Sequence, residues 1–406
     1  MLAIGLTSSA AAQSGNTPAL NYVAGPATVF ATRADLDRYG FAGGPSDGGF
    51  GAIPAGNGTY TFFGHAGSSA ACAGSPRNRG IFAFMGTLDH VTGSNGCHMV
   101  VGRGDAPPGW IFAADYVGGG QAIRFAAAGK AGWFMLVRGE VHWKNPSTPN
   151  NLCRSVPCYY ATIGLAVSTD DGRTFRVAGE ILQARQAVSD FKDGGMNHEI
   201  GYGSLVVADA GGKHINNPPS DPDGAYLYLF FMDTVPGLPG YFMGVARARY
   251  ADVTAAALSG DPHALAKVFR KYDATASDPW SGKGTSDTPD LSVAAGKNSP
   301  LWTDTQGGYQ VVYDRAFDTY LTVHSKGDAI ELRASNDLLH WSGPIGALIG
   351  EPGRKLWFPN LLGETGDPII AGAEPRLYFS SFPKDAYPNW KGSVFESMKL
   401  SLGRGP

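Results

Sequence analysis

Thr162-Ile-Gly-Leu-Ala-Val-Ser-Thr-Asp170 has the pattern of a β-strand that ends in a short polar tag. The same pattern occurs four more times in the 406-residue chain, at residues 81–89, 242–252, 329–337 and 393–401. The first four tags end at Asp89, Asp170, Asp252 and Asp337, which are separated by 81, 82 and 85 residues. A regular period of this length predicts a repeat architecture.

Two more β-patterned runs precede each tagged run, joined by Gly, Asn and Asp turns that are typical of hairpins. The first runs are residues 50–56, 122–129, 203–210, 309–314 and 357–363. The second runs are residues 59–64, 133–139, 226–231, 320–324 and 376–380. Three hairpin-linked strands, repeated five times, predict an all-β chain that folds as a five-bladed β-propeller with long loops between strands.

The repeats predict one propeller domain over residues 27–406. Its blades are expected to cover residues 47–104, 115–184, 199–272, 302–350 and 355–402. The last blade runs out of chain after its third strand, so we expect residues 27–32 to supply the outer strand and close the ring, which would bury two exposed strand edges. Seven blades are the alternative if the long loops contain further strands.

Composition and charge narrow the function classes. A net charge of -3, with Lys and Arg dispersed along the chain, argues against a nucleic-acid partner. No stretch approaches the run of about 20 apolar residues that a membrane span needs.

Residues 1–13 end in the small residues of a signal-peptide cleavage site, although no basic region precedes them. We therefore expect a secreted monomer, extracellular or periplasmic, and a disordered leader is the alternative interpretation of residues 1–13.

The four cysteines agree with export, because disulfides persist in oxidising compartments. Cys153 and Cys158 bracket a turn short enough for a bridge, and Cys72 with Cys97 would tie the loops of the first blade. No metal site is predicted, because Cys97-His98 has no partner pair at a spacing suited to zinc. No cofactor is expected, and a structural calcium ion is left open.

Two of the polar tags have a structural interpretation. Ser168-Thr-Asp170-Asp-Gly-Arg-Thr-Phe175 and Ser335-Asn-Asp337-Leu-Leu-His-Trp341 are expected to turn the chain, with Asp accepting backbone N–H groups and the aromatic ring packing between blades. The first matches the Asp-box pattern of sialidase-type propellers. These acids are therefore predicted to stabilise the fold and to take no part in chemistry.

Other acidic residues stand just before three predicted inner strands. Asp47 precedes that of the first blade, Asp115 that of the second, and His198-Glu199 that of the third. The loops that lead into the inner strands of a propeller converge on one face, so these acids can meet across a pocket. A purely structural role is the alternative, because an Asp before Gly-Gly is most often a turn residue.

With this arrangement the chain resembles the five-bladed propeller glycosidases, the group of arabinanases, β-xylosidases and invertases. The resemblance covers nearly the whole chain and implies a secreted glycoside hydrolase that acts on a poly- or oligosaccharide, with an arabinofuranoside as one substrate type. It implies Asp47 as base or nucleophile, Asp115 as an acidic modulator and Glu199 as general acid. The chain departs from the family's sequence motif at His198, which precedes Glu199.

Glycoside cleavage needs one protonated carboxylic acid and one ionised carboxylate. His198 and Tyr202 are expected to provide the surroundings that keep Glu199 protonated. Further substrate-binding residues fall into two kinds, aromatic rings that stack on sugar faces and polar groups near the channel. These are Trp143, Trp357, Asp314 and Arg315, with Arg138 and Arg247 as further candidates for binding a sugar carboxylate.

Two other functions compete with hydrolysis. A propeller polysaccharide lyase would take the proton beside a uronate carboxylate with His or Tyr, while Arg neutralises the acid. The residues that could build such a site are His65, His198, His214, His324 and Tyr202. A propeller that binds a glycan or a protein without chemistry is the other alternative.

Overall fold

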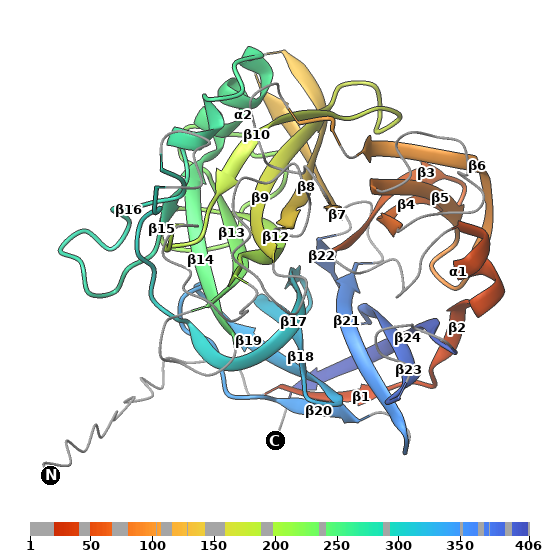
Figure 1. The fold of residues 1–406 in the computed structure, drawn as a ribbon. Helices are drawn as coiled ribbons and strands as arrows, with labels where there is room; N and C mark the ends of the chain where they lie inside the picture. The colour runs from red at the N-terminus through yellow and green to blue at the C-terminus, as the bar shows by residue number, and fades with distance from the viewer. Residues whose placement is uncertain are drawn as a thin grey trace, which may run out of the picture.

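The computed structural model describes residues 20–39, 49–66, 80–102, 104–106, 116–127, 129–142, 159–187, 198–234, 241–286, 293–349, 352–363, 369–372, 374–385 and 392–404. These residues form the predicted five-bladed β-propeller, with the blades arranged in a ring (Figure 1). No helix in this part of the chain is long and apolar enough to cross a membrane.

Each blade is an antiparallel sheet whose strands follow one another outward from the centre. Blade 1 contains β3 (Phe50–Gly56), β4 (Thr59–Ala66), β5 (Gly80–Gly86) and β6 (Val91–Gly102). Blade 2 contains β7 (Tyr116–Ala127), β8 (Lys130–His142), β9 (Tyr159–Ser168) and β10 (Arg176–Leu182). Blade 3 contains β12 (Gly201–Ala208), β13 (Tyr226–Thr234) and β14 (Tyr241–Arg249), with short strands β15 (Arg270–Lys271) and β16 (Gly282–Lys283) outside them.

Blade 4 contains β17 (Trp302–Asp314), β18 (Thr319–Lys326), β19 (Ala329–Ser335) and β20 (Gly346–Ile349). Blade 5 contains β21 (Arg354–Leu362), β23 (Arg376–Pro383) and β24 (Val394–Arg404). Two N-terminal strands, β1 (Leu20–Ala24) and β2 (Thr28–Ala31), pair with β24 and complete this blade. Two short strands join neighbouring blades, since β11 (His198–Glu199) pairs with β9 and β22 (Ile370–Ala371) pairs with β17.

The helices lie outside the repeat pattern. They are α1 (Arg33–Tyr39), α2 (Tyr250–Ser259) and the 3-10 turn η3 (Leu265–Lys267). The tag predicted at Asp252 is wrong as a strand end, because β14 ends at Arg249 and Asp252 lies in the first turn of α2. The Ala-rich stretch of residues 251–257 favours a helix, and this helix replaces the turn that the other tags form.

Buried apolar side chains in the described residues gather in five clusters, one in each seam between neighbouring blades. The seam between blades 5 and 1 contains Phe30 of β2. Its ring centroid lies 5.1 Å from that of Phe62 in blade 1 and 5.1 Å from that of Tyr378 in blade 5. Burial of one such ring stabilises a fold by about 1.5–3 kcal/mol. The N-terminal strand therefore packs against the first and the last blade.

The inner strands of blades 2 to 5 each have an irregular register near their first residues. Gln121 lies in the first of these irregularities, where its side chain accepts the N–H of Leu205 at 2.5 Å and donates to Ser204 Oγ at 3.0 Å. Ser204 in turn accepts the N–H of Val311 at 2.9 Å. Buried hydrogen bonds therefore hold together the inner strands of blades 2, 3 and 4.

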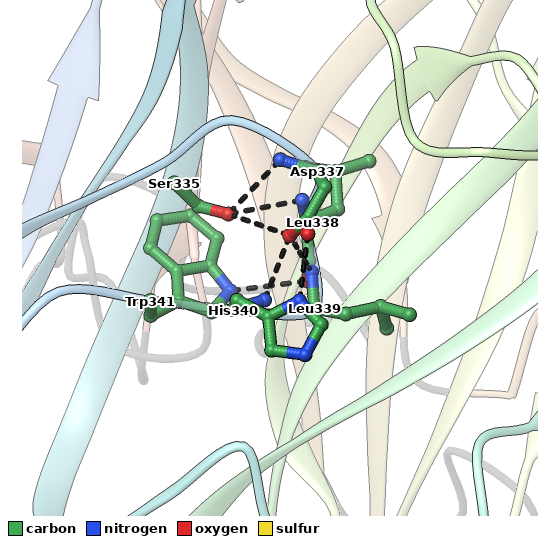
Figure 2. Close-up of polar contacts among 6 residues, drawn as sticks. All are labelled: Ser335, Asp337, Leu338, Leu339, His340 and Trp341. Carbon is green, nitrogen blue, oxygen red and sulfur yellow. Dashed lines mark hydrogen bonds and ion pairs between the residues drawn. The ribbon is translucent and has the colours of Figure 1, made fainter. Parts of the chain in front are cut away.

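The turn after β19 confirms the structural interpretation of the tags (Figure 2). Asp337 Oδ1 accepts the N–H groups of Leu339 at 3.0 Å and His340 at 2.8 Å, and Ser335 Oγ accepts that of Leu338 at 3.0 Å. The Trp341 ring lies edge-on to Phe230 of blade 3, with centroids 5.7 Å apart. The equivalent turn after β9 uses Asp170 in the same way, since it accepts the N–H of Thr174 at 3.0 Å.

Several predictions concern residues outside this description. Residues 1–13, the predicted signal-peptide remnant, lie outside the described residues. So do Cys72, Cys153 and Cys158, and the side chain of Cys97 is not described either. Export and both disulfides therefore stay predictions.

Candidate functional site

A buried ion pair lies near the end of β8, beside the first residues of the inner strand β7. Arg138 pairs in register with Gly118, and Glu140 pairs with Tyr116. Because residues two apart on a strand share a face, the two charged side chains meet, and Arg138 Nη2 lies 2.6 Å from Glu140 Oε1. Arg138 is 3% exposed and Glu140 is 5% exposed. Charges this deeply buried need a close partner, which each provides for the other.

Two tyrosine rings lie against the Arg138 guanidinium. Its Cζ is 5.5 Å from the ring centroid of Tyr116 on β7 and 4.8 Å from that of Tyr202 on β12. The face of an aromatic ring attracts a cation, and the attraction is larger where water is excluded. Arg138 therefore contacts rings from blades 2 and 3 while it pairs with Glu140.

The planar groups continue on both sides of this arginine. Phe358 of β21 stacks on Tyr202 at a centroid distance of 5.8 Å, and Trp357 stacks on Phe358 at 4.9 Å. On the other side, the His65 ring of β4 lies 4.1 Å from that of Tyr116. We call these six residues the aromatic row: His65, Tyr116, Arg138, Tyr202, Phe358 and Trp357. The row connects blades 1, 2, 3 and 5.

Two members of the row have an unusual backbone conformation. Tyr202 has a φ of 51° and Phe358 has a φ of 54°, both in the left-handed region that bulky residues rarely occupy. Blade 2 has glycine at the corresponding irregularity, where Gly119 has a φ of 126° and Gly120 a φ of 142°. A strained non-glycine residue costs about 1–3 kcal/mol and is typical of functional sites. The fold therefore keeps these two rings where glycine would be easier to accommodate.

His65 has a defined tautomer. Its Nδ1 lies 2.7 Å from the carbonyl oxygen of Val117, and the side chain is 8% exposed. Because a carbonyl can only accept a hydrogen bond, Nδ1 carries the proton in neutral His65. The other nitrogen, Nε2, then has the lone pair of a hydrogen-bond acceptor or base.

The backbone of Glu199 lies near the same ion pair. Glu199 pairs with Ala161 of β9, and Ala161 pairs on its other side with Glu140 of β8. Neighbouring strands are about 4.8 Å apart, so the Cα atoms of Glu140 and Glu199 are roughly 10 Å apart. The strand register therefore brings the predicted general acid and a buried carboxylate to the same end of blade 2.

The structure describes only part of the predicted site. Asp47, Asp115 and Trp143 lie outside the described residues, and so do the side chains of His198 and Glu199. Tyr202 and Trp357, predicted from different blades, belong to one aromatic row. Asp115 directly precedes Tyr116, which is also a member of that row.

Asp314 and Arg315 are not part of this cluster. Asp314 is the last residue of the inner strand β17, and Arg315 is the first residue of the turn to β18. Asp314 is buried there and accepts the N–H groups of Ala316 at 2.8 Å and Phe317 at 3.2 Å. Burial raises the pKa of its carboxyl to about 6. Asp314 therefore stabilises this turn, and its binding of substrate stays a prediction.

Arg138 is paired with a carboxylate of the protein itself. Arg138 was a candidate for binding a sugar carboxylate, but Glu140 of the same strand already supplies a carboxylate to it. Sequence reasoning missed Glu140, Tyr116 and Phe358. The available signal was Arg138-Gly-Glu140 at the end of an apolar run, because two opposite charges at alternate strand positions share one face.

A further buried carboxyl lies at the seam between blades 2 and 3. Asp233 is at the end of β13, against β11, and has no exposed surface. Burial raises the pKa of Asp233 to about 6, although the charge of Lys271 acts in the opposite direction.

No three His, Cys, Asp or Glu side chains of the described residues are grouped as metal ligands.

No protein-family model matches the chain, and no curated protein matches its sequence. Solved structures to which the chain is similar include a family 117 glycoside hydrolase of the marine bacterium Zobellia galactanivorans, at 8% identity and a TM-score of 0.47, over 94% of this chain and 90% of that one. They also include an endo-1,5-α-L-arabinanase of Thermotoga petrophila, at 11% identity and a TM-score of 0.42, over 88% and 73% of the two chains.

An N-acetylgalactosamine deacetylase of F. plautii is a third similar structure, at 9% identity and a TM-score of 0.43, over 95% of this chain and 96% of that one. The group of propeller glycosidases that the sequence resembles is represented among these structures. What the site can do chemically follows from its own side chains.

Proposed function

We propose that this propeller is a carbohydrate-active enzyme, a glycoside hydrolase that cleaves a poly- or oligosaccharide beside the Arg138–Glu140 pair. The observation that carries the proposal is the strand register that sets Glu140 and Glu199 on either side of Ala161. Two carboxyl groups that flank a glycosidic bond are the minimum machinery for its hydrolysis.

The two glutamates are proposed to have different roles. Glu140 lies beside a buried guanidinium, which favours the ionised form, so it suits the base, the nucleophile or the stabilising anion. Glu199 is proposed as the general acid that protonates the leaving oxygen. Asp47 and Asp115 remain proposed as an alternative base and as a modulator, from their places before the first two inner strands.

The aromatic row supports a sugar substrate. Tyr116 and Trp357 are its half-buried members, and such rings can stack on the C–H faces of a sugar. Trp143 is proposed as a further platform. Arg138 is already neutralised by Glu140, which favours a neutral sugar such as an arabinofuranoside over a uronate.

The test is the release of reducing ends from a panel of plant, algal and bacterial polysaccharides that includes arabinan. Glu140→Gln and Glu199→Gln should each abolish most of the release. Glu180→Gln is the matched control, because it makes the same substitution at another buried glutamate of blade 2 and should leave activity unchanged. Full activity of Glu199→Gln would refute its role as general acid.

Two other outcomes would favour the competing functions. Products that absorb ultraviolet light would indicate an unsaturated sugar and hence a lyase, with His65 as a base. Firm binding of a glycan without turnover would indicate a binding propeller.

Export is part of the proposal, based on the cleavage-site pattern in residues 1–13. N-terminal sequencing of the protein from culture medium or periplasm would test it. Recovery only from the cytoplasm, with residues 1–13 intact, would contradict it.

A further inference from the structure

Tyr202 combines three features at one position. Its backbone is in the left-handed region, with a φ of 51°, although it is neither glycine nor asparagine. Its side chain is buried, with 7% exposed. Its ring lies 4.8 Å from the guanidinium carbon of Arg138, which in turn pairs with Glu140. A bulky residue kept in a strained conformation indicates that the ring itself is needed at this place.

Arg138 needs such support. Its side chain is long and flexible, and the guanidinium must lie at a fixed place to give Glu140 a contact of 2.6 Å. Tyr116 of the same blade lies 5.5 Å from the guanidinium carbon, and Tyr202 approaches it from blade 3. Rings from two blades therefore restrict where the cation can lie.

We propose that Tyr202 is a positioning residue that acts through Arg138 on Glu140. Its ring holds the guanidinium against the Glu140 carboxylate, which stays ionised and correctly placed beside the glycosidic bond. The catalytic meaning of this contact rests on the hydrolase proposed above, whereas its effect on the protonation of Glu140 does not.

The described groups around Glu140 show why its contact with Arg138 affects its protonation. The described titratable side chains on this face of the neighbouring strands are Arg138 on β8, Tyr116 on β7 and Tyr202 on β12, with His65 on β4 stacked on the far side of Tyr116. Arg138 is the cation among them. Displacement of its guanidinium therefore removes the main group that favours the charged form of Glu140.

The test that needs no substrate is a carbon-13 NMR titration of the Glu140 carboxyl group, assigned by its loss in Glu140→Gln. Tyr202→Leu keeps an apolar side chain but removes the ring, and it should raise the titration midpoint of Glu140 by about one pH unit. Tyr202→Phe keeps the ring and should restore most of the difference. Phe358→Leu is the matched control, because it removes another buried ring with a positive φ, one that stacks on Tyr202.

Kinetics on the substrate found in the panel complete the test. Tyr202→Leu should lower kcat by about 10²-fold with little change in KM, and should move the acidic limb of the pH profile to higher pH. A titration midpoint equal to that of the wild type in folded Tyr202→Leu would overturn the inference, whatever happens to activity. A shifted midpoint in a protein whose wild type turns over no glycan would support the contact and refute the proposed hydrolase.

Discussion

Two glutamates of blade 2 are almost equally buried but have different surroundings. Glu140 of β8 is 5% exposed and lies 2.6 Å from the Arg138 guanidinium. Glu180 of β10 is 1% exposed, and its polar neighbours Thr162 and Gln183 are uncharged. Burial raises the pKa of Glu180 to about 8, so this side chain is mostly neutral at pH 7.

The difference shows that burial does not decide whether a carboxyl group can serve as a base. The nearest charged group decides it, because a guanidinium at hydrogen-bond distance offsets the loss of hydration that an apolar seam imposes. Glu140 is therefore suited to chemistry on a substrate. Glu180 lies on the outer strand β10, where burial keeps its carboxyl mostly protonated at pH 7.

The largest expected difference between the two glutamates is in activity. Glu140→Gln should lower kcat/KM by about 10³-fold, since a positioned acid or base contributes about 10²–10⁴-fold. Glu180→Gln should remain within about twofold of the wild type. Initial rates on the best substrate of the panel measure both. Equal losses in the two variants would show that the difference in surroundings has no catalytic meaning.

The next effect is on stability. Glu140→Ala leaves the Arg138 charge buried without its carboxylate and should lower the free energy of unfolding by about 3–5 kcal/mol. Replacing both members of the pair by Met should recover most of this loss, because no buried charge remains. Urea unfolding at pH 7 measures both variants. A double variant as unstable as Glu140→Ala would contradict the explanation by an uncompensated charge.

The pH dependence of stability should reveal the raised pKa of Glu180. Its pKa rises from 4.5 to about 8 on folding, so between these pH values the unfolded chain is ionised while the folded chain keeps a proton. Wild-type stability therefore falls as pH rises from about 4.5 to about 8, and the contribution is constant above that range. Glu180→Gln removes this contribution, so the free energy of unfolding of the variant should exceed that of the wild type least near pH 5, and the excess should grow by about 3 kcal/mol between pH 5 and pH 8.

Urea unfolding of both proteins at pH 5, 6.5 and 8 measures this excess, and comparison at equal pH cancels the other titrating groups. A stability difference that stays constant over this range would show that Glu180 is already ionised in the folded protein.

The fold was predictable because its signals are local. The run that ends at Asp170 encodes a strand, a turn and a packing ring within a few residues, and the period of the repeat encodes the blades. The tag at Asp252 misled for an equally local reason, since the alanines that follow it favour helix α2. β1 was missed because the repeat pattern calls for one closing strand, predicted at residues 27–32, whereas two N-terminal segments pair with β24.

The candidate site was harder to predict, because its contacts are not local. The aromatic row takes its six residues from four blades, and no motif connects Tyr116 to Tyr202 or Phe358. Tyr202 was predicted as a neighbour of Glu199 and Trp357 as a ring that stacks on a sugar, and neither prediction gave their contacts with Arg138 or Phe358. Glu140 carried the weakest signal, since a charged residue at a strand end usually faces solvent.

The smallest expected effect concerns the turn of Asp337, where a carboxylate has only a structural role. Burial alone would raise the pKa of Asp337, but hydrogen bonds from His340 outweigh it and hold the pKa below its ordinary value. Asp337→Asn keeps an oxygen that can accept the N–H groups of Leu339 and His340, so we expect a loss of less than about 1 kcal/mol and unchanged activity. The loss should shrink as the pH falls through the lowered pKa of folded Asp337, because the wild-type carboxylate becomes protonated there. Urea unfolding at pH 7 and pH 3, with rates at pH 7, measures this variant. A fall in activity without a fall in stability would show that this turn also shapes the site.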